Sequence, residues 1–136
     1  MANTFYSYSA YISPVSNADI TVLREYLETF YQESDNADKP QIVLKDNAIT
    51  ITFDDQYKFY IYLSDEKHVN EEAAEIADYL EEDWNENTYD KEKLKVSQKR
   101  FEIWGDQDFD MDYFNDSLFI IDQIEKFSDI IIFQNQ

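Results

Sequence analysis

Three short segments between residues 41 and 63 alternate apolar and polar side chains, and this alternation limits the fold more than any other feature. Successive side chains of a strand point to opposite faces of a sheet, so we expect strands over residues 41–45, 48–53 and 57–63. Asp46-Asn47 predicts a tight turn between the first two, because both residues tolerate positive φ. The segment therefore predicts an antiparallel meander with one packed face and one partly wet face.

Apolar residues recur at helical spacing in three other places. We expect Ser16 or Asn17 to cap a first helix and Asn70 to cap a second, since short polar side chains accept hydrogen bonds from free backbone amides. A third helix is expected from about Met111, with Asp110 or Asp112 as its cap. The expected inward side chains are, helix by helix, Ile20, Leu23, Leu27 and Phe30, then Ala73, Ile76, Ala77, Leu80 and Trp84, then Phe114, Leu118, Ile121 and Ile124.

The remaining segments complete the order of elements. Strands are expected over residues 5–13, 100–104 and 130–133, the last as an interior strand because it is an unbroken apolar run. We expect a loop over residues 32–40 and irregular structure over residues 85–98, with at most a short strand over 94–97. The order β-α-β-β-β-α-β-α-β predicts a single α+β domain over residues 1–136. Its mostly antiparallel, twisted sheet would have about five to six strands, with three helices on one face.

A large acidic excess limits the partners of the chain. Thirty acidic residues against eleven basic ones leave a formal charge of −19, whereas solubility favours a magnitude of about 2–8 in a small domain. Such an excess destabilises a compact state by self-repulsion, although 43% hydrophobic residues are enough for a core. Phosphates repel this surface, so we expect no direct binding to nucleic acid or to an anionic membrane. The charge predicts a basic protein partner instead.

Several residue types on which enzymes depend are scarce or missing. Cysteine is absent, which excludes thiol catalysis, and Gly105 is the only glycine, which excludes the glycine-rich loops that cradle phosphates. The single histidine, His68, has no serine or cysteine nucleophile pattern near it and is expected at the surface or at a helix cap. We therefore expect no enzyme and no cofactor. Since no signal peptide or membrane span is visible, we expect a cytoplasmic location.

Residues 104–116 hold five aspartates and no basic residue. The alternate spacing of Asp106, Asp108, Asp110 and Asp112 is that of calcium-loop ligands. An EF-hand loop begun at the first of them needs glycine and glutamate where this chain has Met111 and Ser117. We therefore expect no dedicated metal site, and weak binding of a divalent cation stays open. Helix capping explains one or two of the aspartates and leaves the others without a local role.

The second predicted helix carries a row of carboxylates. Glu71, Glu75, Asp78 and Glu82 fall at i, i+4, i+7 and i+11 on one face, and Asp83 and Glu86 extend the band. No lysine or arginine occurs from residue 69 to residue 90, so the helix forgoes the ~0.2–0.5 kcal/mol that each Glu–Lys pair contributes. Helical turns rise about 5.4 Å, which approximates the spacing of phosphates along a nucleic-acid strand.

These features favour a non-enzymatic inhibitor that binds the basic, nucleic-acid-binding surface of a nuclease or related protein. Two settings fit this nucleic-acid mimic: an anti-CRISPR or anti-restriction phage protein, and a toxin-immunity protein. The expected partner-binding residues are acids with two aromatic anchors: Glu71, Glu75, Asp78, Tyr79, Glu82, Asp83, Trp84, Glu86, Asp106, Asp108, Asp110 and Asp112. Further aromatic candidates are Tyr60, Tyr62, Tyr89 and Trp104.

Three alternatives stay open. The first is an adaptor or subunit whose basic protein partner is unconnected with nucleic acid, and the second is a divalent-cation or carbohydrate-active protein. The third is the plain acidic surface of a salt-adapted chain, but such a chain should spread its acids evenly, whereas here they concentrate in residues 65–90 and 102–116. The basic residues Lys91, Lys93, Lys95, Lys99 and Arg100 would cancel the acidic row if they folded back onto the second helix.

Overall fold

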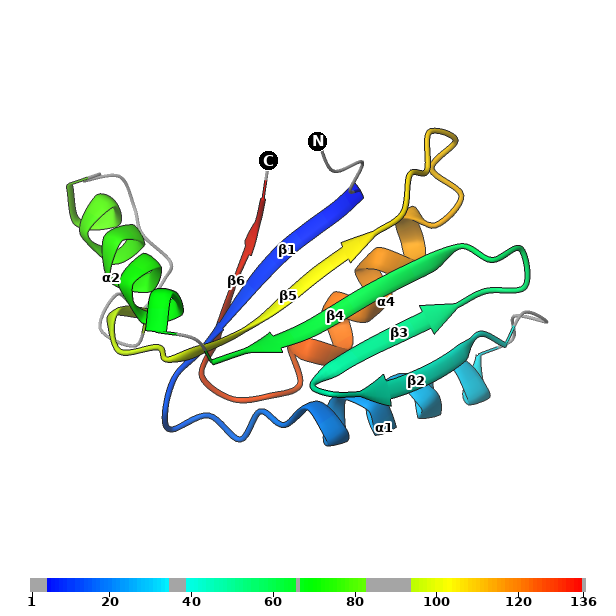
Figure 1. The fold of residues 1–136 in the computed structure, drawn as a ribbon, viewed down its shortest axis with the longest axis horizontal. Coiled ribbons are helices and arrows are strands. Elements are labelled where there is room, and N and C mark those ends of the chain that lie inside the picture. Colours follow the sequence, from blue (N-terminus) through cyan, green and yellow to red (C-terminus); the bar gives the residue numbers. More distant parts are fainter. Residues whose placement is uncertain (1–4, 35–38, 66, 83–93, 136) are drawn as a thin grey trace.

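The computed structural model describes residues 5–34, 39–65, 67–82 and 94–135. Its strands are β1 (Phe5–Ile12), β2 (Gln41–Lys45), β3 (Ala48–Thr52), β4 (Lys58–Ser64), β5 (Lys99–Gly105) and β6 (Ile130–Gln134). The helices with described bounds are α1 (Ile20–Glu33), α2 (Lys67–Glu82) and α4 (Phe114–Ile124). The strands form one sheet in the order β2-β3-β4-β5-β1-β6, and every neighbouring pair is antiparallel (Figure 1). The predicted α+β class and element order are confirmed.

The meander of β2, β3 and β4 has the predicted turn and register. Asp46 and Asn47 have φ angles of 51° and 63°, so both occupy the left-handed region that a tight hairpin turn requires. Ile51 of β3 is paired with Phe59 of β4, and both side chains are fully buried. The alternation of residues 41–63 therefore places one face of this half of the sheet in the core.

α1 and α4 cover that face and enclose the main core (Figure 1). The largest fully buried side chains come from the central strands and from both helices: Leu23, Leu27, Ile49, Ile51, Phe59, Ile61, Phe101, Ile103, Ile120 and Ile124. Full burial of one such side chain stabilises a fold by about 1.5–3 kcal/mol. This side of the sheet is therefore the main source of hydrophobic stabilisation.

The N-terminal cap of α1 differs from the prediction. Asp19 is the cap, because its carboxylate accepts hydrogen bonds from the amides of Thr21 (2.8 Å) and Val22 (3.1 Å). Ser16 and Asn17 bond instead to the segment between α4 and β6. The predicted cap was therefore two or three residues too early, and the two residues have a tertiary role.

α2 lies on the opposite face of the sheet from α1 and α4 (Figure 1). Its buried residues Val69, Ala73 and Ala77 pack with Tyr11 of β1 and with Leu94 in a second, smaller core. The expectation that all helices cover one face is therefore wrong. The physical reason is that β1 is apolar on both faces near its end, so both faces need cover there.

Two other predicted strands are placed differently. β6 lies at the edge of the sheet rather than in its interior, and β1 is its partner. Its apolar run is explained by burial on two sides, since Ile132 contacts the main core and Ile131 contacts the second core. Leu94 and Lys95 are helical rather than extended, and Leu94 is fully buried there.

α4 turns only part of the predicted face inward: Ile124 is fully buried and Ile121 packs against the main core, but the other two predicted residues are exposed. It begins at Phe114 rather than near Met111. Its buried residues are Ser117, Ile120, Gln123 and Ile124. Phe114 and Leu118, which were expected inside, are each 41% exposed. The helix is apolar around much of its circumference, so helical spacing alone did not fix which face is buried.

Candidate interaction surface

α2 presents a row of carboxylates to solvent. Glu71, Glu75 and Asp78 are exposed and lie at i, i+4 and i+7, on the side of the helix away from the buried Ala73 and Ala77. These three residues are called the acidic ridge below. Their placement follows directly from the amphipathic pattern of the sequence.

The start of α2 is tied to the chain segment that precedes β5. The helix begins at Lys67, so Asn70 lies inside it and is not the predicted cap. The side-chain amide of Asn70 donates hydrogen bonds to the carbonyl oxygens of Lys95 (3.2 Å) and Ser97 (2.8 Å). The basic segment therefore does pack against α2, but at the first turns of the helix.

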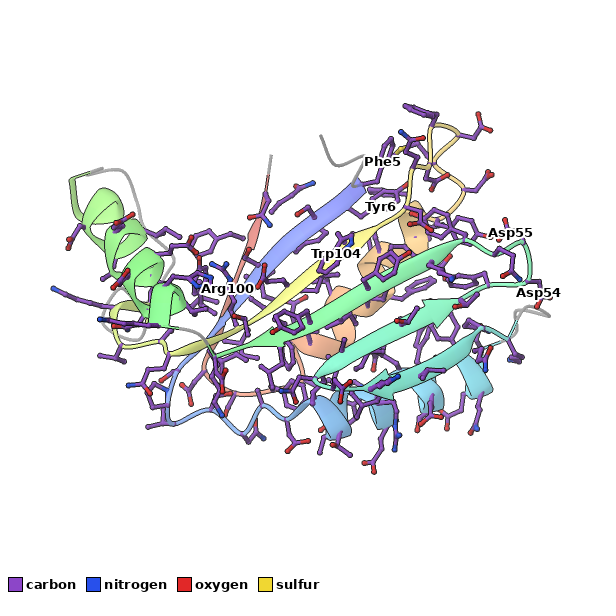
Figure 2. The ribbon with its side chains drawn as sticks, viewed as in Figure 1. Phe5, Tyr6, Asp54, Asp55, Arg100 and Trp104 are labelled. Atoms are coloured by element: carbon purple, nitrogen blue, oxygen red, sulfur yellow. The ribbon has the colours of Figure 1, made fainter. Side chains whose placement is uncertain are left out.

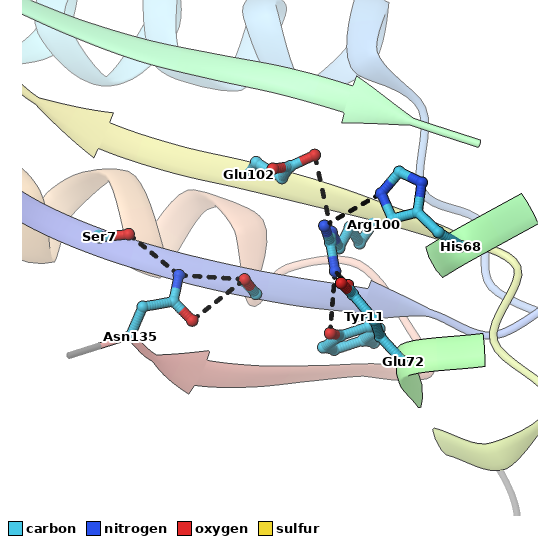
Figure 3. Close-up of polar contacts among 8 residues, drawn as sticks. Ser7, Tyr11, His68, Glu72, Arg100, Glu102 and Asn135 are labelled. Carbon is cyan, nitrogen blue, oxygen red and sulfur yellow. Dashed lines mark hydrogen bonds and ion pairs between the residues drawn. The ribbon is translucent and has the colours of Figure 1, made fainter. Parts of the chain in front are cut away.

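Arg100 is the cation that α2 contacts most closely. Its guanidinium donates to the Glu72 carboxylate and to the hydroxyl of Tyr11 (3.1 Å), and it lies 3.6 Å from a carboxylate oxygen of Glu102 (Figure 3). The ring of His68 is 3.5 Å away. Burial opposes the charge of Arg100, but the bonds to Glu72 and Tyr11 and the charge of Glu102 outweigh it and raise the pKa of the guanidinium. Arg100 thus neutralises carboxylates beside the ridge, not the ridge itself.

The carboxylates of the acidic ridge are not paired with any cation in the described part of the chain. No described lysine, arginine or histidine forms an ion pair with Glu71, Glu75 or Asp78. Lys95 and Lys99 are exposed. Several predicted residues lie outside the described part of the chain: Asp83, Trp84, Glu86, Tyr89, Lys91 and Lys93. The same holds for the side chains of Tyr79, Leu80 and Glu82.

Two aspartates of the 104–116 stretch hold the structure together. The carboxylate of Asp106 accepts hydrogen bonds from the amide of Lys58 (3.1 Å) and the hydroxyl of Tyr60 (3.1 Å). Asp108 is only 7% exposed, and its carboxylate accepts from the amides of Asp112 (3.0 Å) and Tyr113 (2.7 Å) as well as from a tyrosine hydroxyl of β1. Asp108 is thereby withdrawn from any surface that a partner can reach.

The hydrogen bonds that Asp108 accepts from backbone amides take the place of the predicted cap of α4. Tyr113 is the N-cap residue and makes no capping hydrogen bond with its side chain. Neither Asp110 nor Asp112 is therefore the cap, and both side chains are exposed. Asp108 binds the free backbone amides just before the helix from a position outside it. This role was missed because it depends on the turn that brings residue 108 back onto residues 112 and 113.

Asp116 is a third structural carboxylate. It lies in the first turn of α4 and accepts a hydrogen bond from the hydroxyl of Tyr31 in α1 (2.7 Å). Burial raises the pKa of Asp116 above the usual range of an aspartate, and the bond from Tyr31 acts in the opposite direction. Burial also raises the pKa of the Tyr31 hydroxyl. The pair joins the two helices of the main core.

Gly105 allows the chain to leave β5 next to two aromatic rings. A Cβ atom at this position would lie 2.6 Å from the hydroxyl oxygen of Tyr57 and 3.0 Å from the ring of Phe59. The Tyr57 hydroxyl donates to the carbonyl of Asp106 (2.8 Å), so this contact directs the start of the aspartate stretch. The only glycine of the chain is thus explained by close packing.

The aspartate stretch does not assemble a metal centre in the described residues. No three described His, Asp or Glu side chains gather so that they could hold a metal ion. Met111, at the position where an EF-hand needs glycine, has a φ of 62°, so the sharp turn forms without glycine. The Asp108 carboxylate is directed at backbone amides inside the loop.

β5 separates the two acidic segments. Arg100 lies beside α2 and Trp104 near the middle of the sheet (Figure 2), and the aspartate stretch follows the far end of the strand. A strand of seven residues spans about 20 Å at ~3.3 Å per residue. The ridge and the exposed Asp110 and Asp112 are therefore two surfaces, and the prediction had grouped them as one.

Aromatic side chains occupy the open face of the sheet between these ends. The rings of Tyr60 and Trp104 are stacked across β4 and β5, with centroids 5.5 Å apart and an interplanar angle of 21°. Both are half-buried, as is Tyr62, which is paired with Glu102. The two stacked rings therefore partly cover each other on this face.

Comparisons with known proteins add no family: no protein-family model, no curated protein and no solved structure matches this chain. Across the described ranges, no helix combines the length and the apolar character needed to cross a membrane.

Proposed function

We propose that this protein is a non-enzymatic inhibitor whose acidic ridge occupies a basic, nucleic-acid-binding surface of a nuclease or related protein. One observation carries the proposal: Glu71, Glu75 and Asp78 are exposed at helical spacing and have no ion pair among the described residues. A phage protein that blocks a nuclease-based defence and an immunity protein that neutralises a toxin are both of this physical type.

The energetics of the ridge favour an external cation. Like charges at i, i+4 destabilise a helix by about 0.2–0.5 kcal/mol per pair, and the chain as a whole carries a charge of −19. Glu72, on the flank of the ridge, is paired with Arg100 within the chain. Among the described residues, the ridge carboxylates differ from Glu72 in this respect. A groove lined by lysine and arginine would neutralise the ridge, and the net charge would steer such a partner to it.

The position of α2 suits insertion into a groove. The helix stands apart from α1 and α4, on the other face of the sheet (Figure 1). Its inner side is held by Val69, Ala73 and Ala77, so the ridge is presented by a packed element and not by a loop. A packed element loses little conformational entropy when it binds.

Competition with nucleic acid tests this function directly. The immobilised protein is used at low salt to capture its partner from the native host lysate, and the identified partner is then purified and bound again. We expect a duplex or guide nucleic acid to release the partner as its concentration rises, because both ligands use one surface. A partner that stays bound at saturating nucleic acid contradicts the proposal and identifies an adaptor whose partner is unconnected with nucleic acid.

A further inference from the structure

α4 exposes large apolar side chains while it buries polar ones. Phe114 and Leu118, one helical turn apart, are each 41% exposed, whereas Ser117 and Gln123 are 2% and 4% exposed. The Oε1 atom of Gln123 has no hydrogen-bond partner among the described residues. Packing within this chain alone favours the reverse arrangement, because burial of an apolar side chain is favourable and burial of an unsatisfied polar atom is costly. Among the described residues, the outer face of α4 is thus an apolar surface that no other element covers.

The loop before α4 extends the same apolar surface. Phe109 is 78% exposed and Met111 is 52% exposed, so four of the seven exposed large hydrophobic residues found in the described chain lie between residues 109 and 118. The four residues Phe109, Met111, Phe114 and Leu118 are called the apolar patch below. Contiguous exposed apolar side chains of this kind mark interaction sites in folded proteins.

Contacts with β1 make the patch continuous. The ring of Phe109 packs edge-on against Phe5, with centroids 5.2 Å apart, and Phe5 contacts the ring of Tyr6 at 6.0 Å. Tyr6 in turn lies 6.3 Å from the ring of Phe114, and its hydroxyl is 3.7 Å from the sulfur of Met111. Phe5 and Tyr6 lie together at the end of the sheet away from α2 (Figure 2). The patch therefore continues onto the start of β1.

Carboxylates border the patch at both ends. Asp110 and Asp112 are exposed in the loop, and Asp122 is exposed one turn beyond Leu118 on α4. We propose that the outer face of α4 and its preceding loop form a docking site for a basic amphipathic helix of a partner protein. Apolar side chains one turn apart on that helix would lie against Phe114 and Leu118, and its lysines or arginines would meet the acidic border.

Charge decides between this occupant and a second copy of the chain. Two copies meeting at this site would bring the same acidic borders together, in a protein whose net charge is −19. A basic helix gains from the same charges. The site lies at the opposite end of β5 from the acidic ridge and does not depend on the proposed function.

A synthetic peptide tests the proposal. The probe is a helical peptide of about 18 residues, or about five turns, with leucines at i, i+3 and i+4 and lysines elsewhere. Calorimetry gives its affinity for the full chain, and amide chemical shifts map where it binds. We expect shifts over residues 109–122. We also expect affinity to fall by about tenfold or more in Phe114→Ser/Leu118→Ser, since buried apolar anchors dominate such interfaces.

Matched controls make each outcome decisive. A peptide of the same composition with scrambled order should bind at least about tenfold more weakly, because its leucines share no face. Val15→Ser/Val43→Ser, at exposed apolar sites elsewhere, and Glu71→Gln/Glu75→Gln/Asp78→Asn should both keep the affinity within about twofold. Equal binding of the scrambled peptide, or unchanged affinity of the Phe114→Ser/Leu118→Ser variant, overturns the proposal. So does a concentration-dependent dimer in sedimentation that this variant abolishes, because the occupant is then a second copy.

Discussion

The hydroxyl of Tyr6 donates a 2.6 Å hydrogen bond to the buried carboxylate of Asp108, across 102 positions of the sequence. The bond joins the first strand to the aspartate stretch, and two backbone amides complete the shell of the same carboxylate. Burial is the main cause that raises the pKa of the Tyr6 hydroxyl, and the hydrogen bond to Asp108 acts in the same direction. One aspartate of an acidic run is thus the centre of its local structure, and its neighbours Asp110 and Asp112 are exposed.

Replacing Asp108 should therefore destabilise the fold far more than replacing its neighbour. We expect Asp108→Ala to lower the free energy of unfolding by about 2–4 kcal/mol, because three donors lose a charged acceptor. Asp110→Ala, at an exposed site in the same run, should change it by less than about 0.5 kcal/mol. Urea unfolding of both variants measures the difference. Equal effects would mean that the carboxylate of Asp108 has no structural role.

A methyl group at residue 105 should clash with Tyr57. We expect Gly105→Ala to lower the free energy of unfolding by about 1–3 kcal/mol through overpacking against the tyrosine hydroxyl and the ring of Phe59. In the double variant with Tyr57→Phe the hydroxyl is gone, so the two effects should be less than additive by about 0.5 kcal/mol or more. Thermal unfolding of the single and double variants gives the coupling. Simple additivity would contradict the close contact.

The buried carboxylate of Asp116 should make stability depend on pH. Its pKa is raised in the folded state, so the native protein holds the proton to a higher pH than the unfolded chain does, and stability falls as pH rises through the folded pKa. Asp116→Asn keeps an acceptor for Tyr31 and removes this titration. The free energy of unfolding of the variant, relative to that of the natural protein, should therefore increase as pH rises from about 4, the unfolded pKa of an aspartate, toward 7. Urea unfolding at several pH values checks this, and parallel curves would contradict the shift.

Neutralising the middle of the acidic ridge should stabilise the isolated protein. Glu75 has Glu71 one turn before it, and no described cation forms an ion pair with either. We expect Glu75→Gln to raise the free energy of unfolding by about 0.2–0.5 kcal/mol at low salt, and less at high salt because ions screen exposed charges. Glu72→Gln, which removes the carboxylate of α2 that is paired with Arg100, should destabilise instead. A loss of stability in Glu75→Gln would indicate a cation that binds it within the chain.

Several features that depend on one segment alone were predicted correctly from the sequence, although the caps of α1 and α2 were not. The Asp46-Asn47 turn, the alternating strands and the buried Ala73–Ala77 side of α2 all depend on neighbours within a few residues. The face that α4 buries was predicted only in part: Ile124 is buried but Phe114 is exposed, because Phe114 and Ile120 are equally apolar and only the sheet beneath selects one of them. The role of Asp108 was also missed, since it rests on a strand more than a hundred residues earlier.

The separation of the two acidic surfaces has the same origin. Their charges are alike in the sequence, and only the length of β5 places them at opposite ends of the sheet. This separation gives each surface its own test. Charge-neutralising substitutions test the ridge, and the substitutions of Phe114 and Leu118 test the apolar patch.

The affinity of the captured partner for two triple variants tests the central claim most directly. Glu71→Gln/Glu75→Gln/Asp78→Asn removes the ridge, and Glu25→Gln/Glu33→Gln/Asp54→Asn removes the same charge from exposed positions outside α2. Calorimetry near physiological salt should show a loss of about tenfold or more for the ridge variant and less than about twofold for the control variant. Equal losses, or none in the ridge variant, would contradict the account.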